Sequence, residues 1–172
     1  MTVLVLSDTH GRRGRIEDVL SLHSRYDYLL FLGDGLRDIE GVSVTVNGLC
    51  AVRGNCDVFS LGALCDEPTE RVLCLDGVKI LMMHGHTHSV KSGMERAAAY
   101  AYSRGADILL YGHTHVEDNT YFPEGSHIGG VVTERPMYVF NPGSLGEPRY
   151  GKPSYGVMEI RKGSVLLSHG TL

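Results

Sequence analysis

The chain has 172 residues, with 16 lysines and arginines against 20 aspartates and glutamates, giving a net charge of -4 at pH 7. This length predicts one domain over residues 1–172, large enough to bury a core without disulfides or a structural metal. An acidic balance without a basic run excludes a typical nucleic-acid or anionic-membrane binder, so no dedicated nucleic-acid surface is expected.

The apolar stretch at 2–6 is too short for the core of a signal peptide or for a membrane span. The cysteines form no C-x-x-C pair, which is typical of free thiols in a reducing compartment. These four residues are Cys50, Cys56, Cys65 and Cys74. We therefore expect a cytoplasmic protein with no membrane partner.

The first half of the chain alternates apolar runs with helical patterns. Runs closed by polar residues or glycine predict strands at 2–7, 28–32, 42–46, 50–53, 70–75 and 78–83. A helix is expected over 15–24 because its apolar residues recur at helical spacing. Hairpin turns are predicted at Asn47-Gly48 and Asp76-Gly77.

The second half begins with a helical pattern over 92–104 and then becomes mostly β. Ser92 is the expected N-cap, with Glu95 three residues on, and Gly105 is placed to end the helix. Strands are predicted at 108–111, 116–122, 131–134, 137–140, 155–161 and 165–169. Two packed sheets with helices outside would satisfy this order of elements.

Polar residues follow directly after five of the predicted strands. The segments are Asp8-Thr9-His10, Gly33-Asp34, Gly54-Asn55-Cys56-Asp57, His84-Gly85-His86 and Gly112-His113-Thr114-His115. The carboxyl ends of parallel strands meet at one sheet edge, where ligands usually bind. Aspartate, histidine and asparagine suit divalent ions such as Mn²⁺, Fe²⁺ or Zn²⁺. In extended Asp-x-His and His-x-His segments, both side chains would point to one face.

The number of candidate metal ligands indicates more than one ion. The candidates are Asp8, His10, Asp34, Asn55, His84, His113 and His115. One ion needs only three or four protein ligands, so two ions about 3.5–4 Å apart, sharing a carboxylate, fit this set better.

These ordered motifs resemble the calcineurin-like metallophosphoesterases over residues 7 to about 160. The short chain, Cys56 and the late segment Asn141-Pro142-Gly143-Ser144 are most similar to the small bacterial and archaeal phosphodiesterases of that family. The resemblance implies an α/β fold, a four-layer α/β/β/α sandwich of two mixed sheets with flanking helices. It also implies hydrolysis of a small phosphodiester by a hydroxide that bridges two metal ions, so no catalytic side chain is expected as the nucleophile.

The same resemblance assigns the ligands. Asp8, His10 and His115 would hold the first ion. Asn55, His84 and His113 would hold the second, and Asp34 would bridge the two. Manganese is the expected metal, with iron, zinc or nickel as alternatives.

Four residues near the expected centre are candidates for contact with substrate or with the ligands: Asn55, Cys56, Asp57 and His86. Many larger relatives carry a histidine, thought to protonate the leaving group, where this chain has Cys56, and a thiol is a weaker donor. Asp57 either bonds a ligand histidine or is a turn residue. His86, in one of two Gly-His-Thr-His segments, either supports His84, faces the phosphate or lies in a loop.

Two other functions remain open at this point. A phosphomonoesterase would use the same site. A non-catalytic protein-interaction scaffold of the same fold would carry substitutions among the ligands, and this sequence has none. The sequence leaves the physiological substrate undecided and allows a homo-oligomer.

Overall fold

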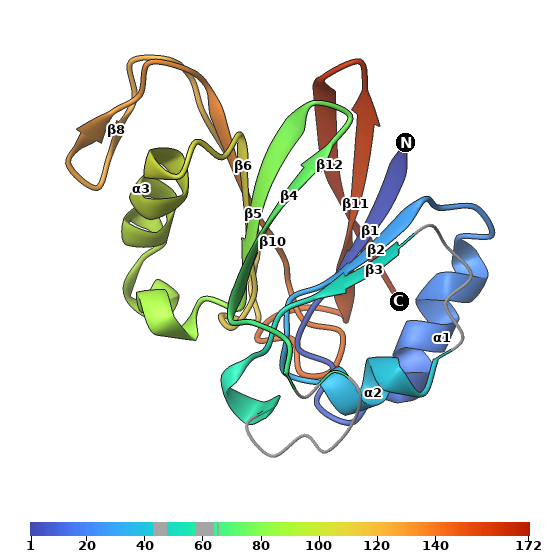
Figure 1. Cartoon of the computed structure of the whole chain (residues 1–172). Coiled ribbons are helices and arrows are strands. Elements are labelled where there is room, and N and C mark those ends of the chain that lie inside the picture. Colours follow the sequence, from blue (N-terminus) through green and yellow to red (C-terminus); the bar gives the residue numbers. More distant parts are fainter. Residues whose placement is uncertain (43–47, 58–63, 65) are drawn as a thin grey trace.

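The computed structural model describes residues 1–42, 48–57, 64 and 66–172. Two five-stranded sheets form the inner layers (Figure 1). In spatial order, the first sheet contains β12 (Ser164–Thr171), β11 (Ser154–Arg161), β1 (Thr2–Leu6), β2 (Tyr28–Phe31) and β3 (Gly48–Ala51). The second contains β4 (Glu70–Leu75), β5 (Val78–Met83), β6 (Ile108–Tyr111), β10 (Met137–Pro142) and β7 (Glu117–Phe122). A small ribbon pairs β8 (His127–Ile128) with β9 (Val131–Val132).

Helices cover the outer face of each sheet. The helices α1 (Arg13–Leu22) and α2 (Leu36–Glu40) lie outside the first sheet, and α3 (Glu95–Ser103) lies outside the second (Figure 1). The predicted four-layer α/β/β/α sandwich is therefore confirmed. Among the described residues, none of the helices has the length and apolar character needed to cross a membrane.

The main core lies between the two sheets. Val3 and Val5 of β1 pack in one buried cluster with Met82 of β5 and Phe140 of β10. Alternate residues of the same strands face the helices, as Leu4 does in the cluster that α1 completes. Burial on both faces explains why these strands are near-continuous apolar runs in the sequence.

The parallel strands of each sheet end at a common edge. In the first sheet β1, β2 and β3 are parallel, and in the second β5, β6 and β10 are parallel. The loops after β1, β2, β3, β5 and β6 carry the polar segments singled out in the sequence. The predicted convergence of these segments is confirmed, and it places the site across the two sheets.

The helix predicted over 92–104 begins later than expected. Gly93 has a φ of 135°, which turns the chain between the short helix η3 (Val90–Ser92) and α3. Met94 precedes the first turn of α3 and makes no side-chain cap. Ser92 as N-cap was therefore wrong, whereas Gly105, at a φ of 77°, lies just past the C-cap as predicted.

The region after β2 also differs from the prediction. The helix α2 was not predicted, and β3 begins two residues before the expected strand at 50–53. Gly48 opens β3, which pairs in parallel with β2. Of the strand expected at 42–46, only Val42 is described, and it lies outside any strand; the rest, and the turn at Asn47, lie outside the described residues.

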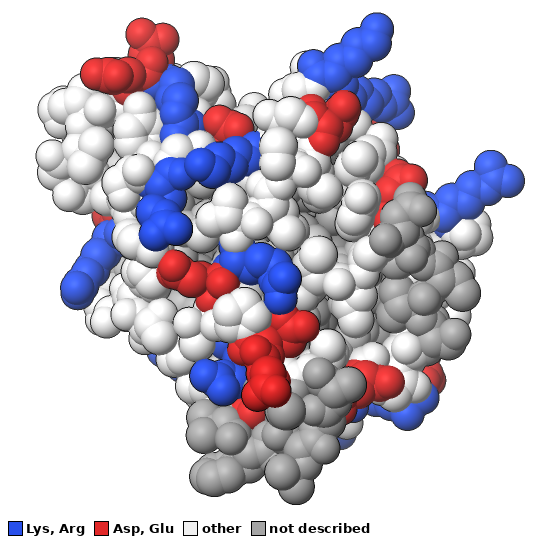
Figure 2. Space-filling view, in the orientation of Figure 1, with Lys and Arg blue, Asp and Glu red and all other residues white. Residues whose placement is uncertain are grey.

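Surface charge agrees with the composition. On the face shown in Figure 2, the acidic and basic side chains of the described residues are interspersed.

Candidate metal centre

The backbone at the ligand positions is left-handed, not extended. Positive φ angles occur at Asp8 (53°), His10 (43°), Asp34 (56°), His113 (68°) and His115 (58°). The prediction of extended Asp-x-His and His-x-His segments was wrong, because each loop turns sharply as it leaves its strand. Such conformations cost on the order of 1 kcal/mol or more per residue and persist only where neighbouring contacts fix them.

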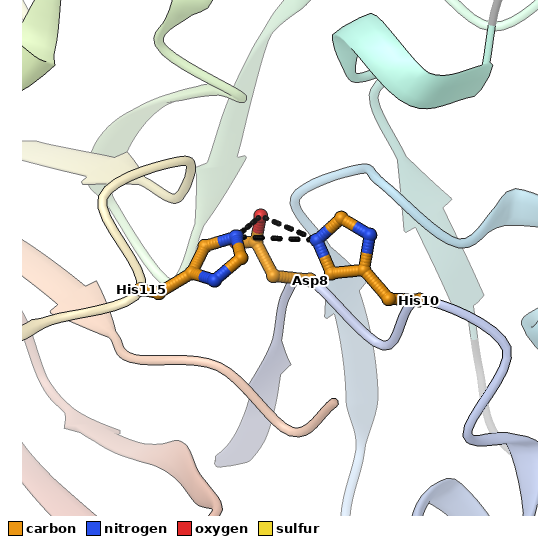
Figure 3. A group of neighbouring side chains, drawn as sticks. All are labelled: Asp8, His10 and His115. Atoms are coloured by element: carbon orange, nitrogen blue, oxygen red, sulfur yellow. Dashed lines mark hydrogen bonds and ion pairs between the residues drawn. The ribbon is translucent and has the colours of Figure 1, made fainter. Parts of the chain in front are cut away.

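One group of candidate ligands combines the loops after β1 and β6. Asp8, His10 and His115 point toward one another (Figure 3). Asp8 Oδ1 lies 3.1 Å from His115 Nε2 and 3.7 Å from His10 Nε2, and the two Nε2 atoms are 3.1 Å apart. Three donor atoms from two sheets thus converge on a point at which one cation could contact all of them.

The second group combines the loops after β2, β5 and β6. His84 Nε2 lies 3.3 Å from Asp34 Oδ2 and 3.1 Å from His113 Nδ1. The two groups adjoin, because Asp34 Oδ2 is also 3.9 Å from His10 Nε2. Asp34 therefore faces both groups.

Each carboxylate presents one oxygen and has the other held by the protein. Asp8 Oδ2 accepts hydrogen bonds from Ser7 Oγ (2.5 Å) and the His113 amide (3.0 Å). Asp34 Oδ1 accepts one from the Cys56 amide (2.7 Å). Asp8 Oδ1 is buried and makes no hydrogen bond to the described residues.

Backbone carbonyls orient two of the imidazoles. His84 Nδ1 donates to Leu32 O (2.8 Å), and His115 Nδ1 donates to Glu147 O (2.6 Å). In the neutral ring this leaves the Nε2 lone pair of each histidine pointing at its group. A second hydrogen bond of this kind is the usual support of a metal-bound histidine.

The electrostatics of the metal-free centre are those of carboxylates among imidazoles. Burial opposes the charge of Asp8, but the neighbouring His10 and His115 imidazoles hold its pKa well below the usual range. The Asp8 carboxylate in turn raises the pKa of His10 and of His115. Burial, aided by the charge of His84, lowers the pKa of His113 to about 4, so this ring is neutral at neutral pH, as a metal ligand must be.

The donor set fits a divalent cation. A buried carboxylate oxygen without a partner is costly, and so are imidazole nitrogens that face one another at hydrogen-bond distance. Both costs fall when a cation accepts the lone pairs. Oxygen and imidazole donors in this mixture suit Mn²⁺, Fe²⁺, Ni²⁺ or Zn²⁺. This is the divalent metal site typical of an aspartate-histidine cluster.

Asp57 has a role that the sequence did not predict. Its Oδ2 accepts from the amides of Asp34 (2.7 Å) and Gly54 (2.9 Å), and its Oδ1 accepts from those of Gly35 (2.9 Å) and Leu36 (3.0 Å). The residue is buried. Among the described residues Asp57 makes no hydrogen bond to a histidine ring, so of the two interpretations the turn residue is the one that these contacts fit. It ties the loop after β2 to the loop after β3 and satisfies the first amides of α2.

Asn55 and Cys56 occupy the loop beside Asp34. The side-chain Nδ2 of Asn55 donates to Cys56 Sγ (3.3 Å), and both side chains are exposed. Cys56 Sγ lies within reach of His10 and Asp34 in a third group of candidate donors. Asn55 as a metal ligand stays a prediction.

His86 lies close to the second ligand group. It lies in the short helix η2 (His86–His88), and its ring centroid is 5.4 Å from that of His84 and 6.2 Å from that of His113. Its Nδ1 is buried and makes no hydrogen bond to the described residues. Its contact with substrate stays a prediction.

The buried end of β10 and the turn that follows it, residues 141–144, are hydrogen-bonded to the loops of the centre. Asn141 Nδ2 donates to Gly112 O (3.0 Å) and Thr114 Oγ1 (3.0 Å). Ser144 Oγ donates to Asp8 O (2.8 Å). This segment therefore holds the loops of both ligand groups.

Two glycines allow the loops to approach. A Cβ at Gly112 would lie 2.1 Å from Ser7 Oγ, and one at Gly54 would lie 2.1 Å from Asp34 Oδ1. Any side chain there would push the carboxylates out of position. These close approaches explain why glycine precedes the polar segments.

An α/β/β/α sandwich with paired aspartate-histidine groups at one edge is the architecture of a metal-dependent phosphoesterase. The chain belongs to the calcineurin-like phosphoesterase superfamily, whose domain profile matches residues 1–163.

Relatives from bacteria agree with this assignment. The probable metallophosphoesterase YsnB of Bacillus subtilis is 29% identical over 162 residues, covering 93% of this chain and 85% of YsnB. The phosphodiesterase YfcE of Escherichia coli K12 is 30% identical over 181 aligned positions, covering 92% of this chain and 88% of YfcE. A crystal structure from Streptococcus pneumoniae TIGR4, of a predicted phosphoesterase, superposes with a TM-score of 0.72 at 27% identity, covering 99% of this chain and 88% of that one.

Proposed function

We propose that this protein hydrolyses small phosphodiesters with two divalent ions bound at the candidate centre. The observation that carries the proposal is the pair of adjoining aspartate-histidine groups. Asp34 faces both, and Asp8 Oδ1 is buried without a hydrogen-bond partner in the part of the chain that the structure describes. The similarity to YfcE, which is named a phosphodiesterase, supports the diester as the substrate class.

The ligand allocation follows the geometry. Asp8, His10 and His115 are proposed for the first ion. His84 and His113 are proposed for the second. Asn55 is added to the second ion on the family resemblance alone. Asp34 is proposed to contact both ions, because its Oδ2 points between the groups.

Two bound divalent ions would supply charge neutralisation at phosphorus and would lower the pKa of bound water toward about 7. The chain itself offers two carboxylates and neutral donors, so the loaded centre keeps a net positive charge that attracts a phosphate monoanion. The family resemblance implies that no side chain acts as the nucleophile, so no covalent protein intermediate is expected.

Manganese is the proposed native metal, with iron, zinc and nickel as alternatives, since the mixed nitrogen and oxygen donors accept each of them. A cytoplasmic location, predicted from the cysteines, stays a prediction.

The test is hydrolysis of bis-p-nitrophenyl phosphate by protein stripped with chelator and then reloaded. Stripped protein should be inactive, and Mn²⁺ should restore activity in proportion to bound metal, approaching two ions per chain. No turnover with any of the four metals would favour the non-catalytic scaffold, and an undiminished rate in stripped protein would contradict the role of the metal ions. Faster turnover of p-nitrophenyl phosphate than of the diester would favour the phosphomonoesterase.

Cys56→His is expected to change substrate preference while metal binding persists. An imidazole at this position adds a stronger proton donor beside His10 and Asp34, and general acid catalysis contributes about 10²–10⁴-fold where it operates fully. We expect the diester-to-monoester rate ratio to change by about tenfold, part of that range. Cys56→Ser, which keeps a small donor, is the control. Identical ratios in all three proteins, at equal metal content, would contradict this role.

A further inference from the structure

A hollow of about 350 Å³ opens directly beside the first ligand group. Its walls include His115, Glu117, Tyr150 and Lys152. A second hollow, of about 360 Å³, lies beside His10 and Asp34. The centre is therefore flanked by two spaces, and a phosphodiester has two ester groups to place in them.

Tyr150 is the unusual residue of the His115 hollow. Its exposed fraction of 74% is the highest among the large hydrophobic side chains of the described residues. Within that part of the chain, its ring makes no ring contact and its hydroxyl makes no hydrogen bond. The ring face of Tyr150 is therefore available to stack on a ligand.

The backbone around Tyr150 is fixed with respect to His115. Glu147 O accepts from His115 Nδ1 (2.6 Å), and the Arg149 amide donates to His115 O (3.0 Å). Beyond the loop, Ser154 Oγ donates to Pro142 O (2.9 Å). Because both ends of the loop are tied to the centre, a ligand on Tyr150 would meet a surface that is already ordered.

We propose that this hollow binds a planar aromatic group of the substrate, stacked on Tyr150, while the phosphate lies at the centre; this rests on the proposed function. Lys152, which has no ion-pair partner among the described residues, lines the same hollow together with the acidic Glu117. Stacking of a base on an aromatic side chain changes affinity by roughly fivefold to a hundredfold. The substrate class is thus a phosphodiester with an aryl or nucleobase-bearing ester group.

Kinetics with two diesters test this proposal. Both carry p-nitrophenyl as the departing group, and the retained group is phenyl in one and methyl in the other. In Tyr150→Ala, the phenyl-to-methyl ratio of kcat/KM should fall about tenfold from the wild-type ratio, mostly through KM, within the range expected for stacking. Tyr150→Phe should keep the wild-type ratio. The intrinsic reactivity of the two diesters cancels in this comparison.

Tyr121→Ala is the matched control. Tyr121 is also exposed, at 51%, and lines a hollow at the opposite edge of the sheets with Val78 and Arg135. It should leave the ratio unchanged. An unchanged phenyl-to-methyl ratio in Tyr150→Ala, or an equal fall of that ratio in Tyr150→Phe, would overturn the proposal.

A binding measurement separates this proposal from catalysis. The chain contains no tryptophan, so Tyr150→Trp introduces a single fluorophore. Thymidine 5′-phosphate should quench its emission saturably in stripped or metal-loaded protein, and ribose 5-phosphate should not. Tyr121→Trp should respond to neither. If Tyr150→Trp shows no quenching in either the stripped or the metal-loaded protein, the aromatic site is refuted, even if diester hydrolysis stands. If quenching occurs but no metal supports hydrolysis, the proposed function fails instead.

Discussion

Asp34→Ala is expected to abolish phosphodiester hydrolysis and to release metal. The side chain is buried, and its Oδ2 lies 3.3 Å from His84 Nε2 and 3.9 Å from His10 Nε2. Removing it deletes the carboxylate shared by the two groups and leaves two cations with less compensating charge. We expect activity to fall by at least about a thousandfold, in line with the several kcal/mol that metal ions contribute to phosphoryl transfer. Bound metal should fall below one ion per chain.

The control for folding is Asp34→Asn. It keeps an oxygen that can accept from the Cys56 amide, which now bonds Asp34 Oδ1 at 2.7 Å, but it lacks the charge. It should unfold close to the wild-type temperature and still lose metal. Asp18→Ala, an exposed carboxylate on α1, should change neither property. Full activity of Asp34→Ala in buffer with excess Mn²⁺ would refute the bridging role.

Asp57→Ala is expected to lower both stability and metal affinity, although Asp57 is not a proposed ligand. Four backbone amides would lose their shared acceptor, those of Asp34, Gly35, Leu36 and Gly54. A hydrogen bond to a charged group contributes about 1.5–3 kcal/mol, and the four are not additive, so we expect the free energy of unfolding to fall by about 4 kcal/mol. Metal affinity should fall about 10- to 100-fold, as for other residues that orient ligands.

Urea unfolding of stripped protein measures the stability loss, and metal titration measures the affinity. Asp57→Asn, with one oxygen acceptor, should fall between wild type and Asp57→Ala. Asp76→Asn is the matched control, because Asp76 is exposed, accepts from a single amide among the described residues, that of Lys162 (3.0 Å), and has a positive φ (48°) that asparagine also tolerates. It should cost about 1 kcal/mol or less. Wild-type stability and metal content in Asp57→Ala would contradict the proposed support of Asp34.

The sequence predicted well which polar residues gather at one edge of the sheets, because each of them directly follows a strand. Asp8 follows β1 and His84 follows β5, and parallel strands bring their carboxyl ends to one edge whatever the details of the loops. These strands were also easy to predict from the sequence, because both of their faces are buried and their residues are apolar throughout.

Local geometry was less predictable. Ser92 had the pattern of a capping box, but the turn at Gly93 starts α3 only at Glu95. The left-handed backbone at Asp8 and His113 was also missed, since only glycine adopts it at little cost. Contacts formed elsewhere in the fold, such as Ser144 Oγ with Asp8 O, hold these residues in place.

By itself the sequence determined the family, the two-sheet architecture and the residues that gather at one edge, because periodicity and strand-end position depend on neighbours along the chain. Only the tertiary structure decided that Asp57 serves four amides, that Asn141 ties down the His113 loop, and that Tyr150 stands beside His115. Those roles depend on atoms far apart in sequence, and a hydrogen bond or a hollow exists only once folding has brought its partners together.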